Sequence, residues 1–158
     1  MTHPEPAHAH TEYSKITDQL YVGTNMCCGM HGQQLAKLGL TADLDLEEER
    51  QELPPTIPAY LWLPVKDHAA PTHGQMLVGA TFIDAVIRGG GKVYIHCRQG
   101  HGRGPTMAAA YFIQAGLTVD EAIAKVRAGR PGAHPEPPQV GALKRFARSL
   151  KAEVPRSK

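Results

Sequence analysis

A cysteine and an arginine mark the two ends of a glycine-rich segment near the middle of the chain, HCRQGHGRG. Five residues separate Cys97 from Arg103. The residues before and including the cysteine, KVYIHC, are apolar enough for a central strand, and a helix is predicted from Thr106 to Gln114. A thiol and a guanidinium are therefore expected at the two ends of a loop that connects a strand to a helix.

A loop of this kind is suited to binding an anion. The N–H groups of the loop and of the first helical turn point into one concavity, and the helix dipole adds to the attraction. Glycine at positions 100, 102 and 104 lets the backbone approach an anion closely. The residues predicted to bind a phosphate are Arg98, Gln99, Gly100, His101, Gly102 and Arg103.

The two end residues add covalent and electrostatic chemistry to the loop. A cysteine at a helix N-terminus or beside a cation favours the thiolate, so Cys97 is predicted to attack phosphorus as a nucleophile. The planar fork of Arg103 can hold two phosphate oxygens, and more strongly as charge spreads in the transition state. His96 is expected on the opposite side of the strand, either as a structural histidine or as a support for the loop.

The composition is that of a single globular domain. The chain has 158 residues, of which 42% are apolar and 20% are charged. A net charge of +2 is too small to favour nucleic acid as a partner. Without an apolar run of about 18 residues, no membrane span is predicted. Three cysteines, two of them adjacent, suit a reducing compartment, so we expect a cytoplasmic protein. We also expect a monomer.

Strands and helices alternate along the predicted domain. Strands are expected at 15–23, 41–46, 59–65 and 92–97, and helices at 32–40, 75–88, 106–114, 118–129 and 138–150. This order predicts an α/β fold with a central, mainly parallel sheet flanked by helices. Ligands of such sheets bind beyond the carboxyl ends of the strands, and Cys97 lies at such an end.

Finer patterns concern the ends of the chain and its last two helices. Residues 1–12 are predicted to be a mobile arm, residues 13–152 the domain, and residues 153–158 a basic tail. Thr118 and Glu121 have the spacing of a capping box. The residues of the last helix predicted to point inward are Val140, Leu143 and Phe146.

With His96, Cys97, five residues and Arg103, the sequence resembles the cysteine-dependent protein tyrosine phosphatases, whose motif is His-Cys, five residues and Arg. The surrounding segments look most like the dual-specificity branch. KITDQLYVG resembles its opening strand, LPVKDHAAPT its general-acid loop, and GRGPTMAAAYFI the helix after its phosphate loop. The resemblance covers residues 15–150. It implies a protein tyrosine phosphatase-like fold and hydrolysis of phosphotyrosine, phosphoserine and phosphothreonine through a phosphocysteine intermediate.

The same resemblance implies a general acid upstream of the cysteine. Asp67, thirty residues before Cys97, matches the family's position. It would protonate the leaving oxygen and then act as base for the water that attacks phosphocysteine. The other interpretation is that Asp67 is a loop or cap residue, and His68 beside it either tunes the acid or is merely exposed. The family mechanism needs no metal or other cofactor.

The sequence departs from the family at Gly104, where relatives carry a hydroxyl that donates to the cysteine sulfur in the second step. Thr106 has a hydroxyl two positions further on. We expect hydrolysis of phosphocysteine to be slow relative to its formation. An alternative enzyme class is a rhodanese-like sulfurtransferase, which also uses a cysteine at the start of such a loop. That family lacks the upstream acid, so Asp67 argues against it. A non-catalytic phosphate-binding pseudophosphatase is suggested by Gly104 alone.

The sequence leaves the substrate open. Arg98 and His101 would make the pocket mouth cationic, which suits a phosphoinositide or a polyphosphorylated RNA end, unless their side chains point outward. The expected partners are a phosphorylated protein or a small phosphate ester, with phosphate, sulfate or vanadate binding in the same loop. Cys27 and Cys28 are either exposed, buried, or partners of Cys97 in a protective disulfide.

Overall fold

Five strands form one sheet in the computed structural model, which describes residues 12–25, 29–51 and 57–153. The strands lie in the order β1-β2-β5-β3-β4. Their bounds are β1 Tyr13–Thr17, β2 Leu20–Gly23, β3 Ala42–Glu47, β4 Ala59–Val65 and β5 Val93–His96. All neighbouring pairs are parallel except β1 and β2. The predicted α/β fold with a mainly parallel sheet is confirmed.

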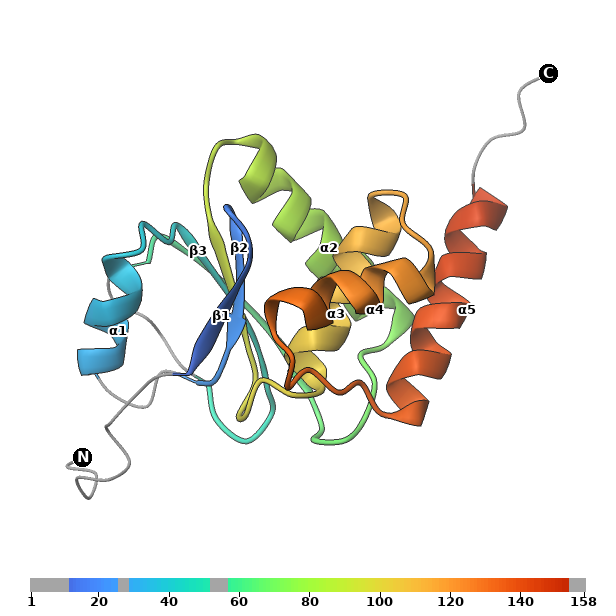
Figure 1. Ribbon diagram of the computed structural model, residues 1–158, viewed down its shortest axis with the longest axis horizontal. Coiled ribbons are helices and arrows are strands. Elements are labelled where there is room, and N and C mark those ends of the chain that lie inside the picture. Colours follow the sequence, from blue (N-terminus) through green and yellow to red (C-terminus); the bar gives the residue numbers. More distant parts are fainter. Residues whose placement is uncertain (1–11, 26–28, 52–56, 154–158) are drawn as a thin grey trace.

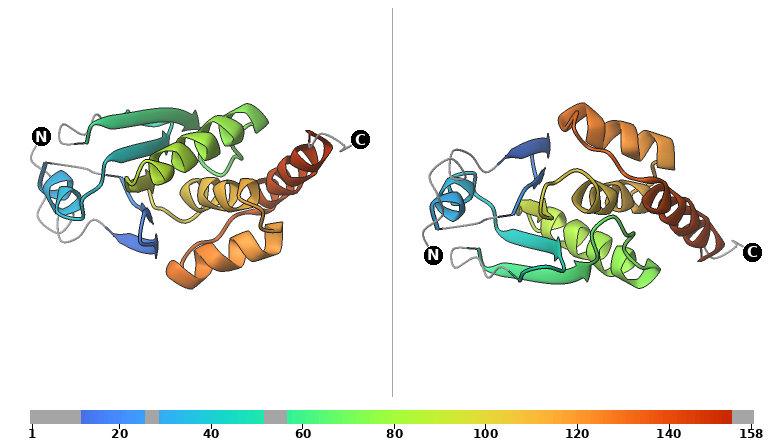
Figure 2. Two further views of the ribbon diagram at one scale, coloured as in Figure 1. Left: turned by 90° about the horizontal axis from the view of Figure 1, so that it is seen from above. Right: turned by 90° about the horizontal axis from the view of Figure 1, so that it is seen from below.

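Five helices cover this sheet from two sides (Figures 1 and 2). Their bounds are α1 Gly29–Ala36, α2 His73–Arg88, α3 Arg103–Gln114, α4 Val119–Gly129 and α5 Pro137–Glu153. Helices α2 to α5 lie on one face, and α1 lies on the other. In the part of the chain that the structure describes, no helix is long and apolar enough to cross a membrane.

The two faces of the sheet have different chemistry because side chains alternate along each strand. Toward α2–α5, β5 presents Val93 and Ile95, which belong to the large core cluster. On the α1 side it presents Tyr94 and His96, and Tyr94 packs in a smaller cluster with Leu35. Helix α3 is the central helix, since ten of its twelve residues are buried. It therefore supports the loop that follows β5 from the side of the large core.

The prediction of a single strand at the start of the domain was wrong. Residues 15–23 were expected to form one strand, but they belong to two antiparallel strands joined by a turn at Asp18 and Gln19. The N–H of Gln19 donates to Thr17 Oγ1 at 3.1 Å, and Lys15 pairs with Asp18 at 2.8 Å. These local contacts stabilise a reversal that the continuous apolar pattern did not reveal.

The helix predictions hold with shifted ends. The capping box of Thr118 and Glu121 is confirmed, with a distance of 3.2 Å from Glu121 N to Thr118 Oγ1. In α5, Leu143 and Phe146 are buried as predicted, but Val140 is only half-buried. The buried positions are 139, 142, 143 and 146, so the inward face begins at Gln139 instead. Apart from Glu12 and Glu153, the predicted arm and tail lie outside the described residues.

Phe146 offers a test of how firmly α5 is attached. It is fully buried in the large core cluster, so Phe146→Ala should lower the free energy of unfolding by about 3–5 kcal/mol. Urea denaturation measures this change. Lys144→Ala on the exposed face of the same helix should change it by less than about 0.5 kcal/mol. Equal effects of the two substitutions would contradict the assigned packing of α5.

Candidate active site

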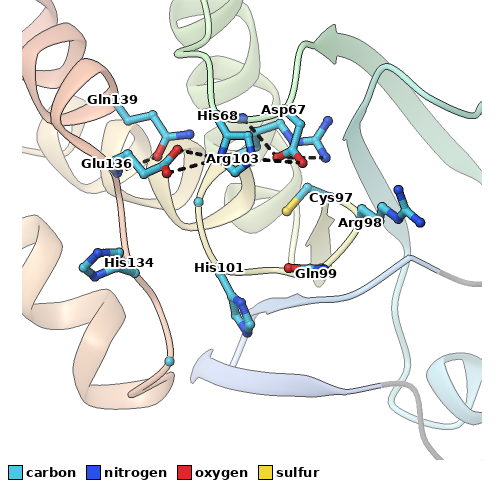
Figure 3. A pocket seen from close by; sticks show the side chains of 12 residues that line it. Asp67, His68, Cys97, Arg98, Gln99, His101, Arg103, His134, Glu136 and Gln139 are labelled. Atoms are coloured by element: carbon cyan, nitrogen blue, oxygen red, sulfur yellow. Dashed lines mark hydrogen bonds and ion pairs between the residues drawn. The ribbon is translucent and has the colours of Figure 1, made fainter.

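The loop between β5 and α3 forms the floor of a pocket of about 450 Å³. It lies at the carboxyl ends of the parallel strands, as predicted for this sheet type. The other walls come from the segment after β4 and from the segment between α4 and α5 (Figure 3). Of the predicted site residues, those that line it are Asp67, Cys97, Arg98, Gln99, His101, Gly102 and Arg103. Gly100 belongs to the same loop but is buried and does not line the pocket.

Cys97 lies at the end of β5 with only 3% of its surface exposed. The N–H of Gly100 donates to Cys97 Sγ at 3.1 Å, so the loop curls around the sulfur. Gly100 has a φ of 72°, and a Cβ at this position would lie 2.7 Å from the Gly23 carbonyl oxygen. Glycine is therefore required here by both its backbone angle and the close approach of β2.

Arg103 is the first residue of α3, and its side chain is 2% exposed. Its Nη1 donates to Glu49 Oε1 at 2.6 Å and to the Val65 carbonyl at 2.8 Å, and its Nη2 donates to Glu49 Oε2 at 3.0 Å. A guanidinium has five N–H bonds. The two N–H bonds that make none of these three contacts are on Nε and Nη2. They lie along one edge of the planar guanidinium, where they can donate to two oxygens of a phosphate.

Glu49 is a site residue that the sequence analysis did not identify. It follows β3 within the acidic run EEERQE, which gives no sign of which carboxylate turns inward. Hydrogen bonding from Arg103 lowers the pKa of Glu49, although partial burial opposes this. Burial lowers the pKa of Arg103, but the Glu49 hydrogen bond and the charges of Cys97, Glu49 and Asp67 outweigh it and raise that pKa overall.

Arg130, at the end of α4, is the second arginine that shapes the loop. Its side chain is buried, and its Nε donates to the Gly100 carbonyl at 2.7 Å while Nη2 donates to the Gln99 carbonyl at 3.2 Å. Its Nη1 also donates to Ser14 Oγ at 3.0 Å. By binding these carbonyl groups outside the loop, Arg130 leaves the loop N–H groups to face the pocket. No spacing in the sequence relates it to the loop.

The hydroxyl of Thr106 does not replace the one missing at Gly104. Thr106 Oγ1 donates to the Gly102 carbonyl at 2.7 Å, within the first turn of its own helix. A Cβ at position 104 would lie 3.7 Å from Cys97 Sγ and 3.4 Å from Val22 Cγ1. A serine hydroxyl at position 104 could therefore reach the sulfur, whereas that of Thr106 is already bonded elsewhere.

Asp67 lies just after β4, on the opposite wall from the loop (Figure 3). Its Oδ1 accepts the N–H of His68 at 3.0 Å and lies 3.6 Å from Arg103 Nη2. The structure thus brings the predicted acid, Cys97 and Arg103 into one pocket. Asp84, another acid upstream of Cys97, lies on α2 and pairs with Arg88 at 2.9 Å.

His96 points away from the pocket into the opposite face of the sheet. Its Nε2 lies 2.8 Å from Asp43 Oδ1, and its ring stacks on Tyr94 with centroids 5.4 Å apart. Asp43, Asp45 and Glu47 follow one another on this face of β3, all buried. Burial raises the pKa of both Asp43 and Glu47. His96 is therefore embedded in an acidic cluster directly behind the nucleophile.

The carboxylates and the imidazole of this cluster are chemically able to bind a cation. Ligand atoms of Asp45, Glu47 and His96 lie within 4.8 Å of one another. However, Asp45 accepts the Tyr60 hydroxyl at 2.7 Å and the Glu47 N–H at 2.9 Å. Glu47 accepts the Asn25 amide at 3.1 Å. The carboxylates of Asp45 and Glu47 therefore already have hydrogen-bond partners within the protein.

The remaining sequence expectations concern charge and thiols at the pocket. Arg98 and His101 are both exposed, and Arg98 is directed away from Cys97 in Figure 3. Among the described residues, Cys97 is a free cysteine. Cys27 and Cys28 lie outside the described residues, so their pairing with Cys97 stays a prediction.

The sequence profile described as the dual specificity phosphatase catalytic domain matches residues 20–149. Human dual specificity phosphatase 28 is 29% identical over 150 residues, covering 88% of this chain and 80% of that protein. The phosphatidylglycerophosphate phosphatase PTPMT2 of Arabidopsis thaliana is 31% identical over 123 residues, covering 73% and 54%. For the matched dual specificity protein phosphatase 5 sequences of Rattus norvegicus and Homo sapiens, the match spans only 21% of their length.

The fold also matches solved structures. The crystal structure of PTPMT1 in complex with PI(5)P superimposes with a TM-score of 0.82, covering 90% of this chain and 99% of that chain. The sequences are 23% identical, so this likeness concerns the fold.

The Glu49 carboxylate offers a test with a pH signature. Its folded pKa lies below its usual 4.5, so its contribution to stability is present above that pH and is lost as the pH falls through the lowered value. Glu49→Gln should therefore be less stable than the wild type near neutral pH, and the difference should shrink below pH 4.5. Urea denaturation across this pH range measures it.

Glu48→Gln is the matched control, because Glu48 is exposed beside Glu49. It should leave the pH profile of stability close to that of the wild type. A stability difference for Glu49→Gln that stays constant with pH would contradict an ionic contribution from the pair with Arg103.

Proposed function

Because the chain belongs to the dual-specificity phosphatase family, we propose that it is a phosphatase that hydrolyses phosphate monoesters through a phosphocysteine intermediate. The observation that carries the proposal is the convergence of three groups in one pocket. Cys97 Sγ lies at the floor, the free edge of Arg103 lies beside it, and the Asp67 carboxylate lies 3.6 Å from Arg103 Nη2. We also propose residues 13–152 as the catalytic unit, acting as a cytoplasmic monomer.

In the first step, the Cys97 thiolate attacks phosphorus and the bond between phosphorus and the leaving oxygen breaks. The N–H groups of the loop and two N–H bonds of Arg103 hold the other three oxygens, whose charge is spread in the transition state. Asp67 gives its proton to the leaving oxygen. The alcohol or phenol departs, and phosphate remains bound to sulfur.

In the second step, water attacks the phosphocysteine. The Asp67 carboxylate accepts a proton from that water, the sulfur–phosphorus bond breaks, and Cys97 returns as the thiolate. A hydroxyl donor beside the departing sulfur would stabilise its negative charge. Gly104 supplies none, and the Thr106 hydroxyl is bonded to the Gly102 carbonyl. We therefore propose that the second step limits turnover.

Glu49, Arg130 and His96 would act on this chemistry indirectly. Glu49 holds the fork of Arg103 in one orientation through two hydrogen bonds. Arg130 holds the Gln99 and Gly100 carbonyls on the outside of the loop. His96 is proposed as a support, since its ring is buried directly behind the cysteine.

The proposed substrates are phosphotyrosine, phosphoserine and phosphothreonine in proteins. Lipid phosphates are a second candidate class, supported by the relative named as a phosphatidylglycerophosphate phosphatase and by the structural neighbour bound to PI(5)P. Phosphorylated RNA ends would use the same loop. The preference among these classes can be measured with a panel of phosphopeptides, phosphoinositides, phosphatidylglycerophosphate and 5′-triphosphate RNA.

The reaction class can be tested with p-nitrophenyl phosphate. Cys97→Ser should lower kcat by at least about 1,000-fold, and Arg103→Ala should weaken inhibition by vanadate, because the fork holds the phosphate oxygens. Asp67→Ala should lower kcat/KM, which reports on the first step, about 100-fold for phenyl phosphate but much less for p-nitrophenyl phosphate, whose leaving group hardly needs a proton. Asp84→Ala is the control acid and should leave both rates unchanged. Full activity of Cys97→Ser would exclude the proposed mechanism.

Gly104 provides a test of the second step. Rapid-quench kinetics of the wild type should show a burst of released phenol followed by slower steady turnover. Gly104→Ser should reduce the burst and raise the steady rate by about tenfold, because its hydroxyl can donate to Cys97 Sγ. A wild type without a burst, turning over at the rate of the serine variant, would show that Gly104 does not limit turnover.

A further inference from the structure

The loop that carries Asp67 contains the one residue other than glycine with positive φ among those that the structure describes. This residue is His68, with a φ of 66°. Side chains make this left-handed conformation costly, and it persists where surrounding contacts enforce it. Such contacts should therefore be found at His68, and they should matter for its neighbour Asp67.

The imidazole of His68 is held by Glu136, from the segment between α4 and α5. The distances from His68 Nδ1 to Glu136 Oε1 and Oε2 are 3.1 Å and 3.0 Å, so one N–H is shared by both carboxylate oxygens. Figure 3 shows the two side chains facing each other across the mouth of the pocket. This contact joins the segment after β4 to the segment before α5.

The conformation of His68 in turn orients the carboxylate of Asp67. The backbone N–H of His68 donates to Asp67 Oδ1 at 3.0 Å. This N–H and the imidazole bound by Glu136 belong to one residue, so holding the ring in place limits the movement of the backbone that anchors Asp67. A chain of contacts therefore runs from the Glu136 carboxylate, through the ring and backbone of His68, to the acid.

Gln139 supports the same arrangement from the first turn of α5. Its side chain is fully buried. Its Nε2 donates to the Ala69 carbonyl at 3.0 Å, and its Oε1 accepts the Glu136 N–H at 2.8 Å. Gln139 thus fixes the backbone on both sides of the contact between His68 and Glu136. A buried amide with both ends bonded is a rigid spacer.

From these contacts we infer that Glu136, acting through His68, is a positioning residue for Asp67. The inference rests on the proposed function, because it takes Asp67 as the general acid. A proton relay through His68 is not needed, since the Asp67 side chain is 55% exposed and exchanges protons with water directly. His68 Nε2 also lies 3.6 Å from Asp67 Oδ2, which is too far for a hydrogen bond.

The test compares substrates that need the acid with substrates that do not. In Glu136→Ala, kcat/KM for phenyl phosphate, which reports on the departure of the leaving group, should fall about tenfold, because a misplaced acid loses part of its effect. The kcat/KM for p-nitrophenyl phosphate should fall by less than about twofold. Vanadate inhibition, which reports on Cys97 and Arg103, should be unchanged.

Two further variants separate positioning from a general loss of structure. Glu136→Gln keeps an acceptor for His68 Nδ1–H and should restore most of the activity on phenyl phosphate. Glu153→Ala removes the same charge at the far end of α5 and should leave both substrates unaffected. Equal losses on both substrates in Glu136→Ala, or no rescue by Glu136→Gln, would overturn the inference.

Combining Glu136→Ala with Asp67→Ala identifies the group through which Glu136 acts. If it acts through Asp67, kcat/KM of the double variant for phenyl phosphate should be no lower than that of Asp67→Ala alone. A further tenfold loss would overturn the inference. If Asp67→Ala is selective for the poor leaving group and Glu136→Ala is not, the inference fails and the proposed mechanism stands. If neither variant is selective, Asp67 is not the acid and both fail.

Discussion

The burial of the Arg103 guanidinium is the constraint on which the rest of the site depends. A positive charge that is removed from water must be paired and hydrogen-bonded, or the fold loses several kcal/mol. Its partners are Glu49 after β3 and the Val65 carbonyl at the end of β4. Because Arg103 begins α3, one side chain links the helix to the ends of two neighbouring strands. The same pairing leaves one edge of the fork facing the pocket.

The loop obtains its shape from a second buried arginine rather than from its own sequence. Arg130 binds the Gln99 and Gly100 carbonyls, so these groups face the protein and not the pocket. The Gly100 N–H, in contrast, is directed at Cys97 Sγ. The two arginines therefore have opposite tasks: Arg103 offers donors to a ligand, and Arg130 removes acceptors that would repel an anion. Together they make the loop attractive to phosphate before any substrate binds.

The residues behind and above the loop complete this preorganisation. Behind it, His96 is embedded among buried carboxylates of β3, with Asp43 at 2.8 Å from its Nε2. Above it, the Asp67 segment is bound by Glu136, just before α5, and by Gln139, in the first turn of α5. Both arrangements join segments that are far apart in the chain. They make the position of each reacting group depend on the packing of α5 and β3 against the rest of the domain.

The sequence by itself predicted the α/β fold, the loop between Cys97 and Arg103, and the location of Asp67 beyond the end of a strand. Local patterns determine these features: an apolar strand, glycines, a helix start, and an acid at the family's spacing. Glu49, Arg130, Glu136 and Gln139 could not be found in this way. Each is an ordinary polar residue in a surface-like segment, and only the tertiary structure brings it to the pocket. Strand alternation could have identified the acidic row of β3, but not that packing on the α1 side buries it. Chain direction and spacing determine where the reacting groups lie along the sequence, whereas hydrogen bonds across the fold decide how each of them is oriented.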